Sequence, residues 1–182
     1  MTIRSTHYAV LLVASLLLVS CSIVSYKCID PLGCLEIPTG SPVVIGVILT
    51  TNGHLSPVGI ACMESIEKVI KDKKNVLGHP ILLDRYATDG TPESARLEAT
   101  DMATDPALLA VVGPSLSGEG LEATPILTEA GIVSLSPVPD PEVAKRMAEQ
   151  VIAAIAQAAI QKADKTLIIP RQALRKALNP SP

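Results

Sequence analysis

The residues best placed to do chemistry lie at 113–120, where an apolar run gives way to the turn "GPSLSGEG". Such a turn can hold a phosphate, carry an acyl group on a serine, or bind another small group. A phosphate loop needs Gly-x-x-x-x-Gly-Lys followed by Ser or Thr, because the lysine reaches the outer phosphates and the hydroxyl holds magnesium. Gly113 and Gly118 have this spacing, but Glu119 and Gly120 follow them. An acid there repels phosphate, so the turn is not a phosphate loop.

A serine nucleophile would need Gly-x-Ser-x-Gly and a histidine partner. The stretch from Gly113 ends in Ser117 rather than glycine, and His79 precedes the second expected strand, at the opposite end of the sheet. The histidines and cysteines also lack the spacing of zinc ligands. We therefore predict no enzymatic activity, no metal and no cofactor.

What remains is a neutral site built from hydroxyls and backbone N–H groups at the start of a helix, which suits a carboxylate. The donors would be the hydroxyls of Ser115 and Ser117 and the N–H groups near Gly118, with Asn52 or Ser56 across the cleft. Serine and glycine also occur at such turns simply to cap the helix. The pattern alone leaves both interpretations open.

The elements that must position this turn alternate between strand and helix patterns. Apolar runs predict strands over 43–50, 80–87, 107–113 and 132–136, with an extended segment over 166–170. Helical spacing predicts helices over 57–74, 92–105, 118–131 (interrupted or kinked at Pro125), from Pro141 behind an Asp140 cap, and over 171–178. Strands that are apolar on both faces need cover on both sides, so we predict an α/β fold with a parallel doubly wound sheet in three layers. Ligands bind such sheets beyond the carboxyl ends of the strands.

The amino-terminal segment, residues 1–20, has the pattern of an export signal: one arginine, a short apolar core, and small residues before Cys21. The ending "LVSC" is similar to a bacterial lipobox, which predicts lipidation of Cys21 and anchoring to the outer face of a membrane. A plain secretory signal or an uncleaved anchor is the alternative. Residues 21–41 are interpreted as a tether, and residues 42–182 as a single lobe.

Export places the cysteines where thiols oxidise. Cys28 and Cys34 flank a tight-turn sequence and are expected to form a disulfide, with two free thiols as the alternative. Cys62 lies in a helical pattern and is expected to be a buried thiol. From residue 21 onward the chain carries 14 Lys and Arg against 18 Asp and Glu, and it has neither Phe nor Trp. This composition argues against a nucleic-acid partner.

Several segments together resemble the periplasmic substrate-binding proteins of ABC importers, specifically the branched-chain amino-acid (Leu/Ile/Val) group. They cover most of residues 28–141 in the order of that family: "DPLGCLEI" with "PVVIGVIL", "NVLGHPILL", "DPALLAVVGPSLSG" and "ATPILTEAGIVSLSP"; "TLIIPRQALRKAL" follows later in the chain. The resemblance implies the type I periplasmic binding protein fold, in which two lobes close on an amino acid.

By this resemblance, the loop after the third strand meets the α-carboxylate and α-amino groups of the ligand. Ser117 takes the position of the family's motif serine, and Ser115 and Leu116 fall on neighbouring ligand-facing positions. After the fourth strand the family has a threonine that binds the zwitterion; here Val138 lies in that stretch and Asp140 replaces the threonine.

In the family, the chain leaves the first lobe after the fourth strand, builds a second lobe and returns. Here Asp140 leads almost directly into a helix, so a second lobe is expected to be missing between about 141 and 150. The resemblance implies an extracytoplasmic amino-acid-binding component of an importer, with ABC permease subunits as partners. The alternative is a degenerate single-lobe lipoprotein that serves as an interaction or structural module without tight ligand binding.

Overall fold

A five-stranded sheet forms the centre of the fold. The structure is a computed structural model that describes residues 26–137 and 139–179. The sheet has the order β3 (Asn75–Val76), β4 (His79–Thr88), β2 (Val43–Thr50), β5 (Leu108–Val112), β6 (Val133–Leu135). All neighbouring strands run parallel except β3, which is antiparallel to β4. Every residue of β2 is buried, as its unbroken apolar sequence predicts for a central parallel strand.

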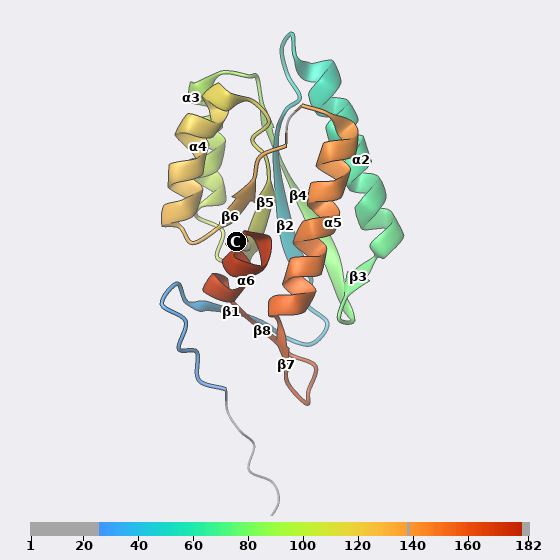
Figure 1. Cartoon of the computed structure of the whole chain (residues 1–182), viewed down its shortest axis with the longest axis vertical. Coiled ribbons are helices and arrows are strands. Elements are labelled where there is room, and N and C mark those ends of the chain that lie inside the picture. Colours follow the sequence, from blue (N-terminus) through green and yellow to red (C-terminus); the bar gives the residue numbers. More distant parts are fainter. Residues whose placement is uncertain (1–25, 138, 180–182) are drawn as a thin grey trace, which may run out of the picture.

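Helices cover both faces of this sheet (Figure 1). α2 (Ser56–Lys73) and α5 (Pro141–Ala158) pack on one face, and α3 (Pro92–Met102) and α4 (Ser117–Glu129) on the other. Successive residues of β2 alternate between the two cores: Ile45 and Val47 join the α2/α5 side, whereas Val44 and Ile48 join the α3/α4 side. The predicted doubly wound parallel α/β architecture is confirmed.

A second, antiparallel sheet lies at the opposite end from the expected ligand loops, with the order β1 (Cys34–Ile37), β8 (Leu167–Pro170), β7 (Ile160–Gln161). α6 (Arg171–Leu178) follows it and packs against α5. The segment interpreted as a tether therefore contains a strand, and Ile37 of that strand is buried in the α2/α5 core. Four residues with a single buried apolar position carry too little periodicity to reveal β1 from the sequence.

Polar contacts join this second sheet to the rest of the fold. The ring of buried His79 lies between two backbone carbonyls, with Nδ1 2.9 Å from the oxygen of Ser41 and Nε2 2.8 Å from that of Lys165. Arg171 donates through its guanidinium to the carbonyl oxygens of Leu108 and Gly131 at 3.3 and 3.4 Å. His79 is thus a structural clamp at the end of the sheet where the sequence placed it.

Two further expectations concern helices. Asp140 caps α5 as predicted, its Oδ1 accepting from the N–H groups of Glu142 (2.8 Å) and Val143 (3.0 Å). α4 runs through Pro125 without interruption. Proline removes the N–H that would meet the carbonyl of Leu121, and Leu121 is strongly exposed, on the side of the helix where water can replace that partner. Across the described residues, no helix has both the length and the hydropathy needed to cross a membrane.

Cys28, Cys34 and Cys62 lie as the sequence predicted. Cys28 and Cys34 form a disulfide, with their Cα atoms 6.0 Å apart. Cys62 is a buried free thiol in α2, and burial together with the nearby charge of Asp140 raises its pKa. Cys21, the expected lipidation site, lies outside the described residues.

Candidate functional site

The loops that follow the parallel strands meet at one edge of the main sheet, as predicted for a ligand site in this architecture. A hollow of about 500 Å³ opens there between the start of α4 and the segment after β6. None of the described residues that line it is charged: Pro114, Ser115, Leu116, Ser117, Gly120, Ser136, Pro137 and Pro139. An uncharged hollow with serine hydroxyls can accept a small polar or zwitterionic molecule, or an apolar side chain.

The turn after β5 is shaped by Gly113. Its φ is 122°, in the region that favours glycine, and a Cβ built there would lie 1.9 Å from the carbonyl oxygen of Ile48. Its own N–H donates to the carbonyl oxygen of Leu135 at 2.7 Å. The turn therefore presses against β2 while it is tied to the end of β6. This close approach fixes where the following residues enter the hollow.

Three of the predicted site residues come together in this hollow. Ser115 is buried, Leu116 is half-buried, and Ser117 is exposed as the first residue of α4. Leu116 occupies the N-cap position in extended conformation, and in the described part of the chain no side chain caps the helix. The serines therefore do not serve as the cap of α4, which removes the simplest structural explanation for them.

A buried polar network supports the floor of the site. Glu119 in the first turn of α4 is fully buried, and both of its carboxylate oxygens lie 3.1 Å from the hydroxyl of Thr50, which donates to them. The hydroxyl of Thr88 donates to Oε1 of the same carboxylate. Thr50 and Thr88 end β2 and β4, so one side chain ties the start of α4 to the ends of two strands. Sequence reasoning noted Glu119 only as a group that repels phosphate and missed this role.

A smaller cavity of about 110 Å³ adjoins the hollow on the side of α2. It shares Ser115, Leu116 and Pro139 with the hollow, and Leu55 and Val58 complete its apolar wall. Leu55 is 51 % exposed and Val58 40 % exposed. The edge therefore presents apolar surface beside the serine hydroxyls.

The remaining predicted ligand residues lie elsewhere. Asn52 is exposed, lines neither cavity, and its backbone N–H donates to the carbonyl oxygen of Thr88 at 3.0 Å. Gly118 also does not line the hollow. A Cβ built on it would have Cγ of Pro92 as its nearest neighbour, at 3.7 Å. Asp140 is exposed and uses Oδ1 to cap α5. Val138 lies outside the described residues.

Within residues 26–137 and 139–179 no three His, Cys, Asp or Glu side chains come close enough together to hold a metal ion. Buried His79 lies between two backbone carbonyls at the other end of the sheet.

Comparisons with known proteins agree on the class of fold. The branched-chain amino acid transporter substrate-binding protein LivJ from Streptococcus pneumoniae, solved in complex with isoleucine, is 24 % identical with a TM-score of 0.51. A putative branched-chain amino acid ABC transporter protein from Rhodospirillum rubrum is 22 % identical with a TM-score of 0.51. Each match covers 53 % of this chain and 29 % of the other. The described residues thus have the fold of a lobe of the type I periplasmic binding proteins.

A leucine binding protein LivK from Thermotoga maritima is 27 % identical with a TM-score of 0.47, over the same shares of the two chains. No protein-family model and no curated protein matches the sequence. In each of these three comparisons with solved structures, the matched part spans less than a third of the length of the other protein. Between β6 and β8 the described residues form α5 and β7.

Proposed function

We propose that this protein is a lipid-anchored extracytoplasmic solute-binding component of an ABC importer for branched-chain or related amino acids, present as a single lobe. The observation that carries the proposal is the uncharged hollow at the carboxyl edge of the sheet, lined by Ser115 and Ser117 beside the start of α4. The fold supports it, because solved neighbours of the same lobe architecture are substrate-binding proteins, one of them in complex with isoleucine. ABC permease subunits would be the partners.

The site offers hydrogen bonds to a ligand carboxylate and apolar contact for a side chain. The donors would be the hydroxyl of Ser117 and the first N–H groups of α4, with Leu116 and the wall formed by Leu55 and Val58 beside them. Each hydrogen bond exchanged with water contributes only about 1 kcal/mol, and somewhat more to a charged group. A single open face cannot exclude water from the ligand. We expect dissociation constants no tighter than roughly millimolar, equivalent to about −4 kcal/mol.

An NMR titration of the protein with leucine, isoleucine and valine tests the proposal. Shifts confined to residues 51–59 and 113–120 would support it. Ser117→Ala should weaken the binding, whereas Ser65→Ala, in the middle of α2 and away from the hollow, should leave it unchanged. Micromolar affinity would contradict the argument from a single lobe. No shifts at ligand concentrations of roughly tens of millimolar would contradict amino-acid binding at this edge.

Anchoring is tested separately through Cys21. The mature protein should partition into detergent, and Cys21→Ser should release it into the aqueous phase, because the acyl chains would be lost. Partitioning that is unchanged by Cys21→Ser would contradict lipidation while leaving the binding proposal intact.

The second candidate is a single-lobe lipoprotein that serves as an interaction module. The exposed apolar side chains of Leu55 and Val58 beside the hollow favour it, since apolar surface around a concave site is typical of protein contacts. The same titration separates the two candidates, because a contact surface requires no response to amino acids.

A further inference from the structure

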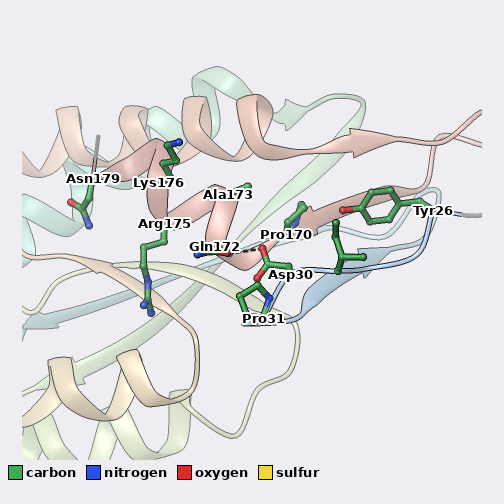
Figure 2. Close-up of a pocket in the computed structure, with 10 residues that line it drawn as sticks. Tyr26, Asp30, Pro31, Pro170, Gln172, Ala173, Arg175, Lys176 and Asn179 are labelled. Atoms are coloured by element: carbon green, nitrogen blue, oxygen red, sulfur yellow. Dashed lines mark hydrogen bonds between the residues drawn. The ribbon is translucent and has the colours of Figure 1, made fainter. Parts of the chain in front are cut away.

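An open groove of about 800 Å³ lies at the other end of the molecule, between the segment that begins at Tyr26 and helix α6 (Figure 2). Its lining includes Tyr26 and Ile29 from the first segment and Arg175 and Lys176 from α6. In Figure 1 the segment that begins at Tyr26 lies at this end of the fold, away from the carboxyl edge of the main sheet. The groove is thus separate from the candidate ligand site.

The groove combines exposed apolar and cationic groups. Ile29 is 84 % exposed, the highest value among the large apolar side chains of the described residues. Arg175 is half-buried and Lys176 is exposed. Among the described residues that line the groove, Asp30 is the one acid, and it is committed to the fold. Its Oδ1 accepts from the N–H of Leu32 and its Oδ2 from the N–H of Gln172, each at 2.8 Å.

The sequence limits how far this groove can lie from a membrane. If Cys21 carries the lipid, as proposed above, five peptide units join it to Tyr26. Five residues span at most about 18 Å even when fully extended. The Tyr26 side of the groove therefore lies within that distance of the bilayer interface, where tyrosine rings and apolar side chains enter the headgroup region and Arg and Lys meet phosphates.

We propose that this groove is the membrane-facing surface of the protein and binds anionic lipid headgroups through Arg175 and Lys176, with Tyr26 and Ile29 entering the interface. The inference rests on the proposed anchoring at Cys21. Contact at this end holds the lobe upright on the bilayer. The carboxyl edge, with its hollow, then faces away from the membrane.

The chain contains no tryptophan, so a single substituted Trp is an unambiguous reporter. Ile29→Trp and, at the opposite edge, Leu55→Trp are introduced separately into the acylated full-length protein, which is then reconstituted on vesicles of phosphatidylcholine mixed with phosphatidylglycerol. Lipids with a spin label at headgroup level quench nearby Trp fluorescence. We expect the Ile29→Trp emission to shift to the blue and to be quenched several-fold more efficiently than that of Leu55→Trp.

The charge requirement is tested in the Ile29→Trp background. A cation near an anionic surface contributes roughly fivefold in binding. Arg175→Gln together with Lys176→Gln should therefore lower the ratio of membrane-facing to free orientations by roughly 25-fold. The matched control is Lys145→Gln with Arg146→Gln on α5. That pair is also adjacent, with one half-buried and one exposed side chain, but it lies in the half of α5 nearer the carboxyl edge. It should leave the quenching unchanged.

Flotation of the vesicles distinguishes failure of this inference from failure of the anchor. Protein that does not float with the vesicles overturns both. Protein that floats, but with Ile29→Trp quenched no more than Leu55→Trp, overturns the membrane-facing groove and leaves the anchor standing. Equal quenching on vesicles with and without phosphatidylglycerol overturns the binding of anionic headgroups.

Discussion

Glu119 offers the sharpest test of how the candidate site is held together. Glu119→Ala removes a fully buried carboxylate and leaves the hydroxyls of Thr50 and Thr88 without their acceptor. Two hydrogen bonds to a carboxylate contribute about 1.5 kcal/mol each, so we expect a loss of about 3 kcal/mol in the free energy of unfolding. For a domain of this size that corresponds to a fall in Tm of about 6–12 °C.

The assay is equilibrium unfolding in urea, followed by circular dichroism, with two comparison variants. Glu119→Gln keeps the volume of the side chain, and the threonine hydroxyls can accept from its amide, so it should cost only about 1 kcal/mol. Glu122→Ala removes an exposed acid from the same helix and should leave the midpoint nearly unchanged. Equal midpoints for Glu119→Ala and Glu122→Ala would refute the conclusion that this network ties α4 to the strand ends.

Three further predictions use the same preparation. Gly113→Ala should destabilise the protein by more than about 3 kcal/mol, because a Cβ at this position would lie 1.9 Å from the carbonyl oxygen of Ile48. Gly118→Ala is the control and should change the urea midpoint little. Similar urea midpoints for the two variants would contradict the close approach of Gly113 to β2. Asp140→Ala should lower the free energy of unfolding by about 1 kcal/mol, because α5 loses its cap. Asp140→Asn keeps a capping oxygen and should lower it much less. Equal losses of stability in the two variants would show that the cap is not the cause. When the protein is unfolded without reductant, an alkylating reagent should label Cys62 but neither Cys28 nor Cys34, because those two form a disulfide. In the native protein its alkylation should be slow and should begin at higher pH than in the unfolded chain, because burial raises its pKa and the thiolate is the reactive form; a fast reaction at neutral pH would contradict its burial.

The sequence predicted the main sheet well, because its strands and helices each carry a strong local pattern. The run 43–50 is the observed β2, and the helix over 171–178 is the observed α6. Short strands were missed, since β1, β3 and β7 have four, two and two residues and depend on partners distant in the chain. No local pattern can reveal pairing between Cys34 and Pro170.

The candidate site was predicted only where the turn itself defines it. Ser115, Leu116 and Ser117 meet in the hollow because they follow one strand directly. Asn52 was expected across the cleft, but the sequence does not fix the side on which a loop after β2 presents its side chains. The role of Glu119 also depends on strand order: its carboxylate meets Thr50 and Thr88 because β5, β2 and β4 are neighbours in the sheet.

The pairing of β1 with β8 has a consequence for the order in which the molecule assembles. Cys28 and Cys34 are only six positions apart, so their disulfide loop can close early, without waiting for the rest of the chain. β1 itself must wait for a partner that lies 136 positions later, opposite Cys34 at Pro170. Closing so long a loop costs more chain entropy than any pairing within the main sheet. β1 is therefore among the last of the described strands to pair, although it is the first of them to be synthesised, and it stays unpaired until β8 has left the ribosome.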